Sequence, residues 1–189
     1  MSLKVVNWDL DGTIGYFFLK NRKINGNLRN SIEEVLLEFQ KKELKQVITT
    51  AAEKDYAEKV LDYFNITQYF ETIFCSNNVG VAIGEKDYTH VIDYFNINRD
   101  EAPENMVIIG NSNDDHPSSL NEMVLIQLPE EDNRDATIIQ EIVFNLLPNF
   151  KTSFQQWFTN GVPKLRNEIQ LEKSQIYKTE KQTYLIKLI

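Results

Sequence analysis

Cysteine is nearly absent from this sequence of 189 residues, and long apolar runs are missing altogether. The single cysteine, Cys75, cannot form an internal disulfide, which favours a reducing compartment. No apolar segment reaches the roughly 18 residues that a membrane-spanning helix needs. The first residues also lack the apolar core of a signal peptide, because Asp9 interrupts them early. We therefore expect a cytoplasmic protein with no membrane partner.

Positive charge is scarce as well, since 20 Lys and Arg residues stand against 28 Asp and Glu residues and give a net charge of −8. An acidic surface repels the phosphates of nucleic acids at long range, so we do not expect nucleic acid as a partner. Histidine is equally rare. Neither His90 nor His116 has neighbours in the sequence that are typical of a metal site, and we expect structural or exposed roles for both.

Short apolar segments alternate with amphipathic segments through most of the chain. Continuous apolar strands separated by helices predict an α/β fold, with a parallel sheet between two helical layers. In such sheets, ligands bind beyond the carboxyl ends of the strands. The expected strands are residues 4–8, 46–49, 72–75, 106–109 and 124–126, and the expected helices are residues 31–42, 53–64, 88–95 and 136–147.

The character of the sequence changes after Pro148. We predict a core of residues 1–148 and a C-terminal extension of residues 149–189. The last 26 positions, residues 164–189, carry six Lys and Arg residues against three glutamates. We expect this basic extension to support a homo-oligomer or to cover the active site. Its predicted elements are a short helix at 150–158 and a β-hairpin formed by 175–178 and 183–187.

The first predicted strand ends in an acidic loop, Asp9-Leu10-Asp11-Gly12-Thr13. Phosphoryl transfer to a carboxylate needs a nucleophile, a cation that neutralises phosphate charge, and a group that handles the leaving-group proton. Asp9 is the candidate nucleophile and a candidate Mg²⁺ ligand. Asp11 is the candidate acid–base group, and its carbonyl is a second candidate ligand. Gly12 permits a sharp turn that brings backbone N–H groups towards the phosphate.

The loop resembles the first motif of the haloacid dehalogenase superfamily, and most closely that of its phosphatases. Dehalogenase members lack the second aspartate, so Asp11 indicates phosphoryl transfer. The resemblance covers residues 5–126 and implies a three-layer Rossmannoid fold, Mg²⁺ as the cofactor and a phospho-Asp9 intermediate.

Two further candidates follow in the order that the family has. Thr49 resembles the strand-end hydroxyl residue that binds phosphate, with Thr50 as the alternative, although a threonine here can equally cap the next helix. Lys86 resembles the lysine that pairs with the nucleophile and the phosphate, although a lone lysine is more often a solvated surface group. The order of the motifs favours the functional interpretation of both.

The fourth motif is where this sequence departs from the family. The segment at residues 107–115 resembles the hydrophobic strand followed by Gly-Asp-x-x-x-Asp, but Asn111 stands at the first acidic position and Asp115 at the second. An amide oxygen can bind Mg²⁺ but brings no charge, so we expect a weakened metal site. Asp115, or its neighbour Asp114, would compensate directly or through water.

Substrate choice in the family depends on cap domains inserted between the motifs. The intervals from Asp9 to Thr49 and from Thr49 to Lys86 are filled by a strand, a helix and their connections, so we predict a capless member. A hairpin expected at residues 16–26 carries aromatic residues that either line the substrate mouth or pack on the core. An open site suits a phosphorylated small molecule or an exposed phosphate on a macromolecule.

Two functions follow from these observations. The first is a Mg²⁺-dependent phosphomonoester hydrolase that acts through phospho-Asp9. The second is a catalytically weakened binding or assembly module that retains the phosphate pocket, and the amide at Asn111 motivates it.

Overall fold

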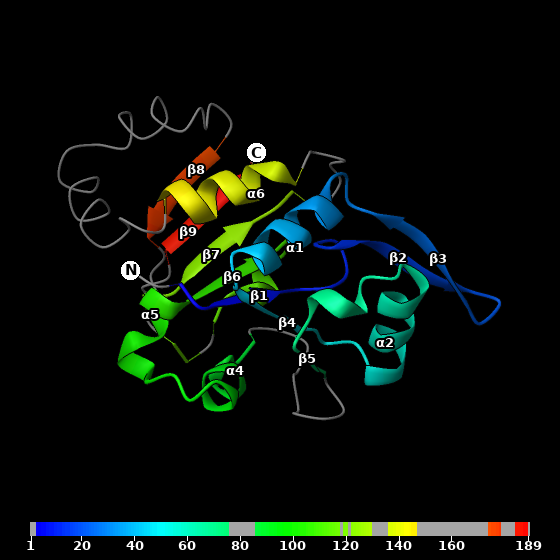
Figure 1. Ribbon diagram of the computed structural model, residues 1–189, viewed down its shortest axis with the longest axis horizontal. Coiled ribbons are helices and arrows are strands. Elements are labelled where there is room, and N and C mark those ends of the chain that lie inside the picture. The colour runs from blue at the N-terminus through cyan, green and yellow to red at the C-terminus, as the bar shows by residue number, and fades with distance from the viewer. Residues whose placement is uncertain are drawn as a thin grey trace.

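A seven-stranded sheet forms the centre of the computed structural model (Figure 1). The structure describes residues 3–75, 86–117, 119–120, 122–129, 136–146, 174–178 and 184–188. The strands of the sheet are β1 (Val5–Trp8), β4 (Lys45–Thr49), β5 (Thr72–Phe74), β6 (Met106–Gly110), β7 (Val124–Gln127), β8 (Ser174–Lys178) and β9 (Tyr184–Leu188). Their order is β5-β4-β1-β6-β7-β9-β8.

The first six strands in that order run parallel, and only the edge strand β8 is antiparallel to its neighbour. In β1, Val5 faces one apolar cluster while Val6 and Trp8 face the other. Apolar side chains therefore leave both faces of the strand, as a sheet covered on both sides requires. This confirms the predicted α/β fold with a parallel central sheet.

Helices cover the two faces. Helices α1 (Ile32–Lys41), α2 (Lys54–Tyr63) and α6 (Thr137–Glu141) pack against one face, and α4 (Thr89–Tyr94) and α5 (Ala102–Asn105) against the other. Helix α1 buries Ile32, Val35, Leu36 and Phe39, the spacing of a single helical stripe. Shorter turns occupy Thr67–Tyr69 (η1), Arg99–Glu101 (η2) and Asn113–Asp115 (η3), and a π-helical turn at Ile142–Leu146 (η4) follows α6.

A separate two-stranded hairpin, β2 (Gly15–Lys20) with β3 (Lys23–Leu28), projects beside α2 (Figure 1). Its turn places Asn21 and Arg22 at positive φ, the geometry of a tight two-residue hairpin turn. Phe17 packs on Phe64 with ring centroids 5.1 Å apart, whereas Phe18 is 55% exposed. One aromatic side chain of the hairpin therefore anchors it to the core, and the next faces solvent.

The predicted C-terminal hairpin is present as β8 and β9, and it joins the central sheet because β9 pairs in parallel with β7. Leu185 and Ile186 of β9 are buried on opposite faces of that sheet. The predicted helix at 150–158 lies outside the described residues, so the domain boundary at residue 148 and the homo-oligomer stay predictions. No helix among the described residues is long and apolar enough to cross a membrane.

The two intervals in which a cap was considered contain no such domain. Residues 10–48 form the β2–β3 hairpin and α1, and residues 50–75 form α2, η1 and β5. Only ten further positions, 76–85, separate these elements from Lys86. That is too few for a folded domain, which agrees with the prediction of a capless chain.

Candidate active site

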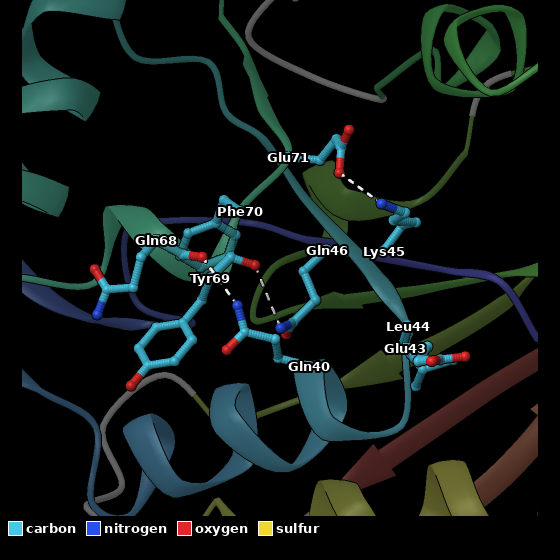
Figure 2. A pocket seen from close by; sticks show the side chains of 9 residues that line it. All are labelled: Gln40, Glu43, Leu44, Lys45, Gln46, Gln68, Tyr69, Phe70 and Glu71. Carbon is cyan, nitrogen blue, oxygen red and sulfur yellow. Dashed lines mark hydrogen bonds and ion pairs between the residues drawn. The ribbon is translucent and has the colours of Figure 1, made fainter.

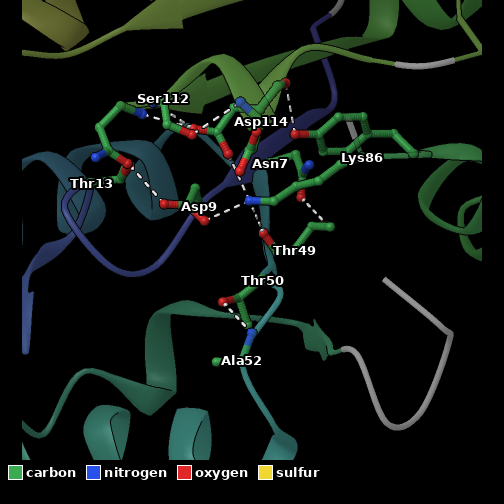
Figure 3. A network of polar contacts seen from close by, with 12 residues as sticks. Asn7, Asp9, Thr13, Thr49, Thr50, Ala52, Lys86, Ser112 and Asp114 are labelled. Carbon is green, nitrogen blue, oxygen red and sulfur yellow. Dashed lines mark hydrogen bonds and ion pairs between the residues drawn. The ribbon is translucent and has the colours of Figure 1, made fainter. Parts of the chain in front are cut away.

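The predicted site residues gather at the carboxyl ends of three neighbouring strands (Figure 3). Asp9 follows β1, Thr49 ends β4, and Asn111 follows β6. Because β1 lies between β4 and β6 and all three are parallel, the sheet brings their ends together. Asp9, Thr49 and Asn111 are 40 or more positions apart in the sequence, and the pairing of their strands makes them neighbours in space.

Backbone hydrogen bonds hold the Asp9 loop in a tight turn. The N–H of Asp9 donates to the carbonyl of Ile109 at 2.8 Å, and the N–H of Gly12 donates to the carbonyl of Gly15 at 2.7 Å. Gly12 has φ of +83°, a conformation that favours glycine. A Cβ at Gly12 would also lie 2.3 Å from the Asn111 amide, so glycine is needed here for space as well.

A buried arginine that the sequence did not single out fixes the same loop from behind. Arg29 is 2% exposed and donates to the carbonyls of Gly12 and Thr13, the latter at 3.0 Å. It also donates to the carbonyl of Pro129 at 3.2 Å. One planar guanidinium therefore ties the Asp9 loop to the segment after β7, which a side chain with a single donor could not do.

Lys86 lies at the centre of the polar network (Figure 3). Its ammonium is 2.6 Å from Asp9 Oδ1, 2.6 Å from Asp115 Oδ1 and 3.1 Å from the carbonyl oxygen of Thr49. The side chain is only 4% exposed. Burial lowers the pKa of Lys86, but the two adjacent carboxylates outweigh it and leave the pKa raised. Lys86 is therefore a buried cation held beside the candidate nucleophile.

Asp9 has the environment of a nucleophile protected from water. Its side chain is 11% exposed, and burial raises its pKa to about 6, against the opposing effect of Lys86. The charge of Asp115 nearby contributes to this rise in the pKa. The hydroxyl of Thr13 lies 3.1 Å from Asp9 Oδ2 and can donate to it. Each carboxylate oxygen of Asp9 thus has a donor that fixes its position.

Asp115, predicted as a metal ligand, is 1% exposed and pairs with Lys86 through one oxygen. Its other oxygen accepts the backbone N–H groups of Asn111 at 2.9 Å and Ser112 at 3.0 Å. A Cβ at Gly110 would lie 2.2 Å from that oxygen, so the glycine makes room for the carboxylate. Both oxygens already accept hydrogen bonds, and a metal role for Asp115 stays a prediction.

Asp11, the candidate acid–base group, has a partner that sequence reasoning missed. The phenol of Tyr56, on α2, donates to Asp11 Oδ1 at 2.7 Å. Burial raises the pKa of Asp11, while the Tyr56 hydrogen bond acts in the opposite direction. A carboxyl with a raised pKa holds its proton more readily, which suits proton donation to a leaving group.

The hydroxyl groups of Thr49 and Thr50, the two candidates for phosphate binding, have different hydrogen-bond partners. The hydroxyl of Thr49 donates to Asn7 Oδ1 at 2.9 Å, below the site, and lies 3.4 Å from His90 Nε2. The hydroxyl of Thr50 accepts the N–H of Ala52 at 3.2 Å (Figure 3), and its own proton can be donated elsewhere. The structure therefore gives Thr49 a hydrogen bond inside the protein and places Thr50 at the start of the following loop.

His90 lies closer to the site than the sequence indicated. It is on α4, and its ring packs on Phe74 with centroids 4.6 Å apart. Burial lowers its pKa, although Asp87 raises it. Asn7, whose side-chain oxygen accepts the Thr49 hydroxyl, is fully buried, and its side-chain nitrogen has no hydrogen-bond partner among the described residues. Thr49 therefore connects His90 with a buried polar side chain of β1.

Three oxygen-bearing groups meet where a cation would be held. The terminal atom of the Asn111 amide that points inward lies 3.1 Å from the Asp11 carbonyl oxygen and 3.2 Å from Asp9 Oδ2. With its oxygen inward, Asn111 completes a set of three hard oxygen ligands, which fits Mg²⁺ in chemistry but with a single carboxylate. Among the described residues no three His, Cys, Asp or Glu side chains form a metal site. A cation here would therefore depend on neutral oxygens.

A groove at the opposite end of the sheet does not share this chemistry. It has a volume of about 560 Å³ and lies between the end of α1, the start of β4 and η1 (Figure 2). Several of its polar groups are already paired, since Lys45 lies 3.0 Å from Glu71 and Gln40 donates to the carbonyl of Gln68 at 3.1 Å. The amino ends of parallel strands are also not where such sheets bind ligands. We therefore assign the site to the Asp9 end.

The fold therefore carries, at the carboxyl end of a central strand, an aspartate that is paired with a buried lysine. Residues 18–125 match the haloacid dehalogenase-like hydrolase family. The match covers more than half of the chain, and the chain belongs to that family. The matched segment begins after the Asp9 loop, so the roles in that loop depend on its own residues and geometry.

Solved structures of low sequence identity share the fold. The core domain of a candidate phosphoglycolate phosphatase from Streptococcus pneumoniae is 21% identical with a TM-score of 0.53, covering 76% of this chain and 96% of that one. A candidate beta-phosphoglucomutase from Thermotoga maritima is 12% identical with a TM-score of 0.51, covering 72% and 90%. No curated sequence gives a significant match. These likenesses confirm the fold predicted from the motifs.

Proposed function

We propose that this protein hydrolyses phosphomonoesters with Mg²⁺ through a phospho-Asp9 intermediate. The observation that carries the proposal is the pairing of Asp9 with Lys86 at 2.6 Å at the carboxyl end of the central strand. Asp11 stands two residues further on. A buried carboxylate beside a fixed cation suits attack on a group with concentrated negative charge, because the cation attracts the phosphate to the nucleophile.

The reaction has two steps, after which Asp9 and Asp11 are back in their starting protonation states. A carboxylate oxygen of Asp9 attacks phosphorus, the bond from phosphorus to the leaving oxygen breaks, and Asp11 gives its proton to that oxygen. A water molecule then loses a proton to Asp11 and attacks the phosphorus of phospho-Asp9. Inorganic phosphate leaves, and Asp9 returns as a carboxylate. Lys86 stays protonated throughout and balances the charge on the phosphate.

The cation would be held by a carboxylate oxygen of Asp9, the carbonyl of Asp11 and the amide oxygen of Asn111. When bound, Mg²⁺ supplies neutralisation of charge on the transferred phosphoryl group. Its affinity depends on one carboxylate, so we expect millimolar rather than micromolar requirements, on the order of 1 mM. The substrates that suit a site without a cap are phosphorylated small molecules or phosphates exposed on a macromolecule.

Hydrolysis of 4-nitrophenyl phosphate in 10 mM Mg²⁺, about ten times that expected requirement, tests the proposal. Asp9→Asn should lose at least ~10³-fold in turnover, because the amide cannot form the acyl phosphate. Asp100→Asn makes the same chemical change at an exposed position of η2 and should retain full turnover. Equal rates for wild type and Asp9→Asn would refute a phospho-Asp9 mechanism.

A second function is favoured by one observation, the amide at Asn111 in place of a charged ligand. Under this alternative the protein binds a phosphorylated partner and turns it over very slowly. Two measurements together separate the functions: a binding module holds inorganic phosphate in calorimetry with Mg²⁺ present, but releases no nitrophenol from 4-nitrophenyl phosphate. Rapid turnover by the wild type would exclude the alternative.

A further inference from the structure

We propose that the amide of Asn111 takes the place of the cation when no cation is bound. With its nitrogen turned inward, Asn111 bridges Asp9 and the Asp11 carbonyl, and a cation enters only after the amide makes a half-turn. This inference rests on the proposed function only in taking the same pocket as the cation site. It concerns how the protein holds that pocket together without metal.

The geometry permits both orientations of the amide in one space. The inward atom of Asn111 lies 3.2 Å from Asp9 Oδ2 and 3.1 Å from the carbonyl oxygen of Asp11. Both of these neighbours are acceptors, and the third neighbour, the Thr13 hydroxyl at 3.1 Å, is the one group there that can donate to an oxygen. A nitrogen there can donate one proton to each of the two acceptors. Without a cation, the orientation with nitrogen inward is the one that satisfies the hydrogen bonds.

The same spacing also suits a cation. An octahedral Mg²⁺ ion with bonds of about 2.0–2.1 Å holds adjacent ligand oxygens about 3 Å apart. The observed 3.1 Å and 3.2 Å separations are close to that value. The exchange therefore needs a rotation of one terminal amide and little movement of the Asp9 loop. Gly12 leaves room for this rotation on the other side of the amide, where a Cβ would lie 2.3 Å from it.

An aspartate at position 111 could not behave in this way. Its carboxylate would face Asp9 Oδ2 and the Asp11 carbonyl as a third acceptor, and would be repelled unless a cation or a proton lay between them. A carboxylate would in return attract a divalent cation more strongly. Asparagine at position 111 therefore binds a cation more weakly than aspartate would, but it satisfies the hydrogen bonds of the Asp9 loop when no cation is present.

The test uses Asn111→Asp, with Mg²⁺ alone as the probe, and requires no turnover. In 10 mM Mg²⁺, wild type should melt about 3–6 °C higher than in EDTA, the rise that mass action gives for a site with a dissociation constant near 1 mM. Asn111→Asp should melt at least ~3 °C lower than wild type in EDTA and recover in Mg²⁺. Calorimetry should give Asn111→Asp at least ~10-fold tighter Mg²⁺ binding. Asn113→Asp, an exposed position in η3, adds the same charge and should change neither quantity.

A second measurement on wild type guards against a variant that fails to fold. The side-chain NH₂ signals of Asn111 in a ¹⁵N spectrum should be strongly shifted in EDTA by hydrogen bonding and should move when Mg²⁺ is added. The proposal is overturned if these signals ignore Mg²⁺, if EDTA lowers the melting temperature of wild type as much as that of Asn111→Asp, or if both bind Mg²⁺ equally. An inactive phosphatase would leave all these results unchanged, so the failure of the proposed function is distinguishable.

Discussion

Tyr56 donates its phenolic proton to Asp11 Oδ1 across 2.7 Å, which joins the first turns of α2 to the carboxyl proposed to move protons. The two residues are 45 positions apart in the sequence. Asp11 has to face the leaving oxygen in one step and water in the next. A donor on one of its oxygens fixes the rotation of the carboxyl and leaves the other oxygen for the reaction.

Tyr56→Phe removes this hydrogen bond with little change in packing. We expect kcat for a phosphomonoester to fall about tenfold while KM changes less than about twofold, because substrate binding does not use the phenol. Steady-state kinetics will measure the two constants. Tyr63→Phe makes the same change at a 63% exposed position of α2 and serves as the control. A rise in KM with kcat intact would argue for a binding role instead.

Lys86→Met tests the buried ion-pair network. Asp115, which is fully buried, and Asp9, which is 11% exposed, would then lose their common cation, so we expect the free energy of unfolding to fall by about 3–5 kcal/mol. Urea denaturation will measure the change. Lys54→Met breaks an exposed pair with Glu58 and should cost less than about 0.5 kcal/mol. A small loss for Lys86→Met would mean that the carboxylates become protonated or hydrated at little cost.

His90 predicts a dependence of stability on pH. Burial lowers its pKa below the ordinary value of 6.5, so the unfolded chain binds a proton there more readily than the folded protein does. Above pH 6.5, His90 is neutral in both states and the folded protein keeps its full stability. As the pH falls below 6.5 towards the lowered pKa, the unfolded chain takes up a proton at His90 before the folded protein does, so stability is lost. Wild type should lose more stability than His90→Gln between pH 7.5 and pH 5.5, an interval of about one unit on each side of the ordinary histidine pKa. If urea denaturation gives wild type and His90→Gln the same loss of unfolding free energy between the two pH values, His90 has no such role.

Ile186→Ala tests whether the C-terminal hairpin is part of the core. Ile186 is fully buried in β9, so its truncation should cost about 2–5 kcal/mol in unfolding free energy. Lys187→Ala, next to it and exposed, should cost less than about 0.5 kcal/mol. Thermal or urea unfolding will compare the two variants. Equal stability would mean that β9 contributes little to the sheet.

The sequence determined most of the fold because its signals are local. The alternation of apolar strands with helical stripes predicted the parallel sheet, and the spacing of Ile32, Val35, Leu36 and Phe39 predicted α1. The loop from Asp9 to Thr13 and the position of Lys86 could be recognised because each motif is a short run with its own chemistry. Neighbouring residues carry these patterns, so no knowledge of the tertiary structure was needed.

Tertiary structure alone decided the partners of those residues. Tyr56 and Arg29 carry no motif, and only the packing of α2 and the chain beyond β3 brings them to Asp11 and Gly12. Pairing of β9 with β7 likewise depends on contacts between strands far apart in the sequence. Asn111 combines the two cases. Its identity was plain from the sequence, but its place between Asp9 and the Asp11 carbonyl follows from the parallel register of β1 and β6, which sets the two strand ends side by side.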